Sequence, residues 1–465
     1  MNRGLPRRSL LVALAASLAL LGPALVPGPG TGSVGADESA IAFTEPAGPV
    51  LAPLDPTTTP MPDPATLASL LSGPLGSPAL GGEVSAVVFD PATGMLLFDQ
   101  AGDTPRTPGS VVKVLTAVSV LQAVGPSSRL VTTAHYDPAT ATLVLVGAGD
   151  PTLSTRSGEG SSLAALADAV VASPEGPGVG ASIRLTYDAS LFAGPTIAVG
   201  WSDSYPATGV AAPVSALVVD GARIPGGEAR QPDPAQAAAR VFADLLAERG
   251  VTVDAPQPGP VGAARQIAST ESVPLAQVVQ TMLTDSDNDY AEILAHLAGA
   301  TRFGVGTFET GSQAALATLT SMGISTTGIT LFDGSGLSVD NRVPTRTFAQ
   351  VLTSMTRAAS SGADGGSVLD GSWGWPVLGG LAIAGVTGTL ADRFYTESSY
   401  AGAGVVHAKT GTLTGVSALA GTVVDREGRL LVFSFTTNSA ADVSSARASL
   451  DDAATVLARC GCQPG

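Results

Sequence analysis

Lysine is almost absent from this chain. Among 23 lysine and arginine residues only two are lysines, Lys113 and Lys409. Arginine stays protonated in proteins, whereas lysine can lose its proton when it is buried or lies beside another cation. A GC-rich coding bias would explain the preference for arginine, but it does not explain the two exceptions. Both lysines are therefore candidates for amine chemistry. The alternative is that they have no special role and remain in the sequence by chance.

Cysteine and histidine are also scarce. The two cysteines, Cys460 and Cys462, are one residue apart near the end of the chain, a spacing that allows a strained disulfide at best. The chain is therefore not a disulfide scaffold. The three histidines have no metal-ligand spacing, and an H-E-x-x-H motif is absent, which argues against a zinc peptidase. We expect no metal and no organic cofactor.

The sequence has few positively charged residues and few long apolar runs. The formal net charge of −16 argues against nucleic acid or an anionic membrane surface as a partner. Arg3, Arg7 and Arg8 precede an apolar run at 9–21 that is short for a membrane span, and Val34-Gly35-Ala36 is a plausible cleavage site. This pattern predicts a signal peptide at 1–36 and export to the periplasmic space, cell wall or exterior. Later runs are too short to predict a transmembrane anchor in the mature chain.

The rest of the chain alternates between strand and helix signals. Proline-rich residues 37–66 predict a linker, at whose end Asp63-Pro64 predicts the start of a short helix through Leu71. Further patterns predict hairpins at 83–100 and 129–147, helices at 162–172 and 234–249, a strand at 181–188 and a closing helix at 441–459. This mixture indicates an α/β (α+β) fold.

The first lysine lies in an unusual stretch, TPGSVVKVLTAVSVL at 107–121. Its length, its start at Pro108-Gly109 and its stop at Gly125-Pro126 favour a helix that is apolar nearly all round and therefore buried. Burying a lysine is costly unless it pairs or becomes neutral. Ser110 precedes Lys113 by three residues and shares its helix face, so a buried amine lies next to a hydroxyl, an arrangement that activates a nucleophile.

Three short motifs follow one another along the chain. They are Ser110-Val111-Val112-Lys113, Ser286-Asp287-Asn288 and Lys409-Thr410-Gly411. Each motif alone is weak, but the order and the presence of both lysines within them make the set specific.

With these motifs the chain resembles the class C low-molecular-mass penicillin-binding proteins, the serine-type D-Ala-D-Ala carboxypeptidase/endopeptidase family. The stretches GAGDPTL, DGSGLSVDN, AGVTGTLADR and AKTGTLTGVSALAG are also similar to that family. The resemblance covers about 83–455. The chain departs from the family in having Gly109 before the serine, where alanine is commoner, and we expect this glycine to loosen the helix start. The step from Ser110 to Ser286 is also short for this family, which is expected if one insert is reduced or missing.

The resemblance implies a penicillin-binding transpeptidase-like domain, with an antiparallel sheet flanked by helices and interrupted by an inserted domain. We assign the catalytic domain to 67–129 and 263–459, the inserted domain to 130–262, and a tail to 460–465.

The resemblance also implies roles for eight residues. Ser110 is expected to attack the substrate carbonyl, Lys113 to take its proton, and Ser286 to pass a proton to the leaving amine. Lys113 is expected to be neutral because of burial and of a permanent charge on Lys409. Substrate is expected to be bound by Asn288, Lys409, Thr410, Gly411 and Thr412.

The implied activity is removal of the terminal D-Ala from peptidoglycan stem peptides ending in D-Ala-D-Ala, with endopeptidase cleavage of cross-links as a further activity. Penicillins and other β-lactams are expected to acylate Ser110. Two alternatives remain at this point: a serine β-lactamase-like hydrolase, which shares the motifs, and a non-catalytic cell-wall-binding module on the same fold.

Overall fold

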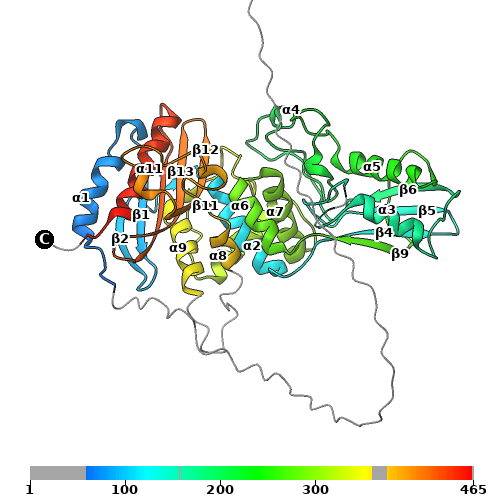
Figure 1. Ribbon diagram of the computed structural model, residues 1–465, viewed down its shortest axis with the longest axis horizontal. Helices are drawn as coiled ribbons and strands as arrows, with labels where there is room; N and C mark the ends of the chain where they lie inside the picture. Colours follow the sequence, from blue (N-terminus) through cyan, green and yellow to red (C-terminus); the bar gives the residue numbers. More distant parts are fainter. Residues whose placement is uncertain (1–58, 157, 159, 359–373, 463–465) are drawn as a thin grey trace, which may run out of the picture. The chain divides into compact units, whose positions relative to one another are not determined.

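The computed structural model describes residues 59–156, 158, 160–358 and 374–462 (Figure 1). The predicted signal peptide at 1–36 and most of the predicted linker lie outside the described residues. Within these ranges, every helix is too short or too polar to cross a membrane.

A six-stranded antiparallel sheet forms the centre of the catalytic part. Its strand order is β11-β12-β13-β14-β1-β2, so the first and last thirds of the described chain share one sheet. The strands are β1 (Val84–Asp90), β2 (Met95–Gln100), β11 (Ala382–Ile383), β12 (Val406–Leu413), β13 (Val416–Val424) and β14 (Leu430–Thr437). A separate two-stranded pair joins β3 (Pro105–Arg106) to β10 (Val343–Pro344).

Helices cover both faces of this sheet, as expected from the resemblance (Figure 1). One face carries α1 (Pro64–Leu75) and α11 (Val443–Arg459). The other carries α2 (Lys113–Val124), α6 (Leu275–Asp285), α7 (Asn288–Phe303), α8 (Phe308–Ser321), α9 (Thr345–Ala358) and α10 (Trp375–Gly379). All of β1 is buried because its alternate side chains enter the two different cores. The predicted antiparallel sheet flanked by helices is confirmed.

The middle of the chain builds a second sheet. Its strand order is β7-β6-β5-β4-β9, with β8 also paired to β6. The strands are β4 (Val131–Asp137), β5 (Thr142–Val146), β6 (Ser182–Asp188), β7 (Thr252–Val253), β8 (Gln257–Pro258) and β9 (Arg265–Glu271), and they pack with α3 (Leu163–Ala172) and α5 (Pro234–Glu248). A short helix, α4 (Tyr205–Thr208), lies in the long connection between β6 and α5.

The boundary of this second sheet differs from the assignment made from the sequence. The inserted domain was placed at 130–262, but β9 pairs antiparallel with β4 and therefore belongs to the same sheet. β9 was missed because its residues, RQIASTE, are mostly polar and partly exposed, with a weak strand pattern.

The first helix begins as the sequence predicts but ends later. The Asp63 side chain accepts a hydrogen bond from Thr66 N at 2.8 Å, with Pro64 at the first helical position. Residues 64–66 therefore belong to the helix and not to the linker assigned to 37–66. The helix continues past Leu71 to Leu75 because both side chains, with Leu67, pack in the core beneath α11.

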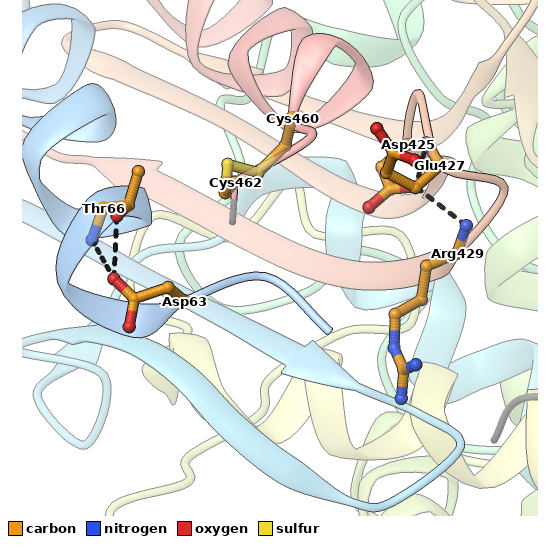
Figure 2. The surroundings of a disulfide bond; sticks show 7 residues. All are labelled: Asp63, Thr66, Asp425, Glu427, Arg429, Cys460 and Cys462. Carbon is orange, nitrogen blue, oxygen red and sulfur yellow. Dashed lines mark hydrogen bonds between the residues drawn. A yellow bond between two sulfur atoms is a disulfide. The ribbon is translucent and has the colours of Figure 1, made fainter. Parts of the chain in front are cut away.

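The end of the chain is tied to the start of this helix. Cys460 and Cys462 form a disulfide directly after α11. Asp63 N donates to the Cys462 carbonyl oxygen at 2.7 Å, and Arg426 N donates to that of Cys460 at 3.2 Å. Figure 2 shows the disulfide beside the Asp63–Thr66 cap and the Asp425–Arg429 turn. The residues after α11 thus connect the start of α1 to the turn between β13 and β14.

Candidate active site

Ser110 and Lys113 lie at the start of a buried helix. A 3-10 turn at Gly109–Val112 leads directly into α2, so the predicted helix starts as a tighter turn. Lys113 is fully buried, and its Nζ lies 3.0 Å from Ser110 Oγ. The three-residue spacing therefore places the amine against the hydroxyl.

Two further groups contact the Lys113 amine from distant parts of the chain. Its Nζ donates to Asn288 Oδ1 at 2.8 Å and to the Ser335 carbonyl oxygen at 2.8 Å. The orientation of the Asn288 amide is set by its other end, because Nδ2 donates to the Val210 carbonyl oxygen at 2.8 Å. Both groups facing Lys113 can therefore only accept hydrogen bonds. Ser110 is the one partner that can either donate or accept.

The protonation of Lys113 reflects competing influences. Burial lowers its pKa to about 8, while the negative charges of Glu292, Asp333, Asp287 and Asp289 act to raise it. The amine is therefore protonated and neutral in comparable amounts near pH 8, and a minor neutral fraction is present at neutral pH. That balance suits a general base.

Glu292 is a site residue that sequence reasoning missed. Its carboxylate oxygens accept from Gly334 N at 3.0 Å and Ser335 N at 2.7 Å, which holds the loop whose Ser335 carbonyl faces Lys113. Burial is the main cause that raises the Glu292 pKa to about 8. The available signal was its spacing: it lies four residues after Asn288, on the same face of α7.

The second lysine motif meets the second serine motif. Lys409, on β12, is fully buried, and its Nζ donates to Ser286 Oγ at 2.8 Å and to the Thr410 carbonyl oxygen at 3.0 Å. Ser286 joins α6 to α7 in the left-handed conformation, with φ 59°. Non-glycine residues in this conformation are uncommon and concentrate at functional sites.

The pKa of Lys409 is influenced differently from the expectation. Its pKa is lowered well below the usual value, first by burial and then by the charge of Lys113. The expected influence was the reverse, a permanently charged Lys409 lowering the pKa of Lys113. The reason is that four carboxylates act to raise the pKa of Lys113, whereas burial and the charge of Lys113 both act to lower the pKa of Lys409.

The strand that carries Lys409 lies very close to the turn that carries Ser110. A Cβ added at Gly411 would lie 2.2 Å from the Pro108 carbonyl oxygen, and one added at Gly109 would lie 2.9 Å from Thr412 N. Gly109 also has a φ of +55°, which disfavours alanine. Glycine at 109 therefore fits a close contact rather than loosening the helix start. Gly411 likewise accommodates the protein's own turn, in addition to the expected approach of substrate.

The hydroxyl groups on β12 have partners outside the three motifs. Thr410 Oγ1 donates to Thr389 Oγ1 at 3.0 Å, and Arg447 Nη2 donates to Thr412 Oγ1 at 3.1 Å. The structure thus brings the three motifs together through two lysine–serine contacts, the Lys113–Asn288 contact and the approach of β12 to the nucleophile turn. Across the described ranges, no group of three or more His, Cys, Asp or Glu residues is arranged to hold a metal ion.

This fold and these motifs define a family of serine peptidases. The model of the D-Ala-D-Ala carboxypeptidase 3 (S13) family matches residues 67–230 and 224–458. The chain belongs to this family, whose members are D-Ala-D-Ala carboxypeptidases.

Among curated relatives, carboxypeptidase DacB of Mycolicibacterium smegmatis is 34% identical over 428 residues, which cover 90% of this chain and 88% of the relative. The D-alanyl-D-alanine carboxypeptidase of an Actinomadura species is 28% identical over 452 residues, covering 78% of this chain and 79% of the relative.

Among solved structures, penicillin binding protein 4 of Haemophilus influenzae superposes with a TM-score of 0.66 at 21% identity, covering 85% of this chain and 98% of that one. The same protein complexed with a β-lactam superposes with a TM-score of 0.61 at 20% identity, with the same coverage. These similarities support the penicillin-binding fold.

Proposed function

We propose that this carboxypeptidase cleaves the terminal D-Ala from peptidoglycan stem peptides through an acyl-enzyme on Ser110. Ser110 Oγ attacks the carbonyl carbon of the penultimate D-Ala, and the amide bond to the terminal D-Ala breaks. The hydroxyl proton passes to Lys113 and then to the leaving amine. Water hydrolyses the resulting ester and regenerates Ser110.

The observation that carries this proposal is the set of partners around Lys113. A neutral amine has two N–H donors and one lone pair, whereas an ammonium group has three donors. Asn288 Oδ1 and the Ser335 carbonyl oxygen accept the two N–H donors, so the lone pair of the neutral amine faces Ser110 Oγ at 3.0 Å. The site therefore directs a general base at the nucleophile without a histidine.

Ser286 is proposed to carry the proton to the leaving amine. It lies 2.8 Å from Lys409 Nζ, so its hydroxyl oxygen accepts from that amine and its own proton remains available to donate. Asn288 is proposed to bind the substrate amide with the second N–H of Nδ2, because the first is used by Val210.

The binding groups on β12 complete the proposed site. Lys409, Thr410 and Thr412 would bind the terminal carboxylate, and Gly411 would allow the substrate backbone to approach the strand. The backbone N–H groups of Ser110 and Thr412 would form the oxyanion hole, which is supported by the proximity of Gly109 to Thr412 N.

The substrate and the inhibitors follow from this chemistry. β-Lactams present a strained amide next to a carboxylate, and the β-lactam complex of the Haemophilus influenzae protein supports their use of this fold. Cross-links in which D-Ala is the acyl donor would present the same scissile bond, which supports endopeptidase activity. Peptidoglycan lies outside the cytoplasmic membrane, and the charged and then apolar pattern before residue 36 supports export.

The test uses purified protein and its Ser110→Ala variant. With fluorescent penicillin, the wild type should be labelled covalently at Ser110, and with a D-Ala-D-Ala peptide it should release free D-Ala. Ser110→Ala should stay folded and lose both. Labelling of the variant at the wild-type level would contradict the assignment. Rapid release of hydrolysed penicillin would indicate a β-lactamase instead.

A further inference from the structure

Arg447 lies beside the hydroxyl of Thr412, at the end of the strand that carries Lys409. It comes from α11, is half-buried, and donates from Nη2 to Thr412 Oγ1 at 3.1 Å. Among the described residues it has no carboxylate within ion-pair distance. A partly desolvated cation without an anion is unusual, because burial of charge is normally compensated.

The neighbouring arginine shows what Arg447 lacks. Arg393 Nη2 lies 2.6 Å from Asp451 Oδ1, and Arg393 Nε lies 3.1 Å from Asp451 Oδ2, so this carboxylate is held by Arg393. Burial and then the charge of Arg393 lower the pKa of Arg447. Two cations thus share one carboxylate, and an anion bound near Thr412 would relieve the imbalance.

The hydrogen-bond direction at Thr412 favours such an anion. Guanidinium groups donate and do not accept, so Arg447 uses a lone pair of the Thr412 hydroxyl and leaves its proton free. A carboxylate accepting that proton would meet a donor already polarised by a cation. Thr410 and Thr412 lie on the same face of β12 because side chains alternate along a strand.

We propose that Arg447 is a substrate-binding residue whose permanent charge, acting with the Thr412 hydroxyl, recognises the free carboxylate of the terminal D-Ala. This assignment rests on the proposed function and adds a group from outside the three motifs. In this proposal Arg447 and Lys409 both contribute positive charge to binding of the carboxylate. Arginine keeps its charge at every relevant pH, whereas burial and the charge of Lys113 lower the pKa of Lys409.

The test compares a penicillin with its methyl ester, in which the carboxylate is neutral. Benzylpenicillin and benzylpenicillin methyl ester are reacted with wild type, Arg447→Gln and Arg447→Lys, and the second-order acylation rate constants are measured. Arg240→Gln, on the helix α5 that packs against the second sheet, is the control for loss of an arginine. Thermal melting checks that each variant is folded.

Arg447→Gln should lose about 10- to 100-fold in acylation by the free acid, the worth of a hydrogen bond to a charged group. The acylation rate constant of Arg447→Gln with the methyl ester should change little. Arg447→Lys should recover part of the loss seen with the free acid, and Arg240→Gln should match wild type with both compounds. Equal losses with acid and ester would show that Arg447 only supports the structure and would overturn the proposal. If Arg447→Gln fails to fold, the acid-to-ester rate ratio of Arg447→Lys decides, since it must fall below that of wild type. Failure of the proposed function would look different, because Ser110→Ala would then still be labelled.

Discussion

Lys113 and Lys409 are equally buried but lie in opposite electrostatic surroundings. Burial lowers the pKa of Lys113 to about 8, while four carboxylates act to raise it. Lys409 is influenced by burial and by another cation, and its pKa falls well below the usual value. The pKa values of two lysines at the same depth are therefore influenced differently, because distant segments contribute carboxylates near Lys113 and a cation near Lys409.

This difference separates the part of the site where the protein itself supplies negative charge around a lysine from the part where it does not. Lys113 has hydrogen-bond acceptors and nearby negative charge from the protein alone. Among the residues that the structure describes, Lys409 contacts a hydroxyl and a backbone carbonyl but no carboxylate, and Arg447 beside the same strand has no carboxylate within ion-pair distance. We infer that the Lys113 side is preorganised for proton transfer, whereas the β12 side becomes electrically balanced when a carboxylate binds.

Replacing Lys113 should have the largest effect. Lys113→Arg keeps a cation but cannot supply a neutral amine, so acylation by a penicillin should fall by at least about 10²-fold. The measurement is the acylation rate constant from intact-protein mass spectrometry. Acylation of this variant as fast as that of Lys409→Arg would remove the distinction between the two lysines.

Substitution of Gly411 should move the strand that carries Lys409 away from the turn that carries Ser110 and precedes Lys113. In Gly411→Ala the new methyl group would lie 2.2 Å from the Pro108 carbonyl oxygen, so β12 must move away from the nucleophile turn. Misplacement by about 1 Å can cost roughly 10²-fold in rate. Gly73→Ala is a matched control, because a Cβ at that position on α1 has no atom within 4 Å. Comparable acylation by both variants would contradict the close approach.

Lys409→Arg should have a smaller effect. The variant places a permanently charged guanidinium on β12 that can still bind the substrate carboxylate, so acylation should persist at about one tenth of the wild-type rate constant, with the loss mainly in binding because the guanidinium geometry differs. A kcat and KM comparison with a D-Ala-D-Ala peptide checks this. A loss confined to kcat would show that Lys409 acts mainly in the chemical step.

Glu292→Gln should shift the pH dependence without abolishing activity. Glu292 has its own pKa raised to about 8, so it carries its charge mainly above that pH, where that charge is the largest electrostatic influence raising the pKa of Lys113; the glutamine removes it. The neutral amine then forms at lower pH, so the rising limb of the acylation profile should move to lower pH by roughly one unit or less. The other charged groups facing Lys113, Asp333, Asp287, Asp289 and Lys409, remain in this variant. An unchanged midpoint, with the variant folded, would show that Glu292 acts only by holding the Gly334–Ser335 loop.

Local sequence predicted those features of the site that depend on local geometry. The contact of Ser110 with Lys113 follows from helical spacing, and the strand around Lys409 follows from its pattern and the following turn. Contacts from Val210 and Ser335 were not predictable, because they use backbone carbonyls brought in by distant loops. The lowering of the Lys409 pKa by the charge of Lys113 was not predictable for the same reason, since Asp333 and Glu292, which act to raise the Lys113 pKa, reach it only in the folded chain.

The most direct test of the account is the pH dependence of acylation in the wild-type enzyme. The second-order rate constant for reaction with a penicillin should rise with pH and have a midpoint near the Lys113 pKa of about 8, because the neutral fraction of the base increases through that value. A rate constant that is flat, or that falls, between about pH 6 and pH 9 would contradict neutral Lys113 as the general base for Ser110.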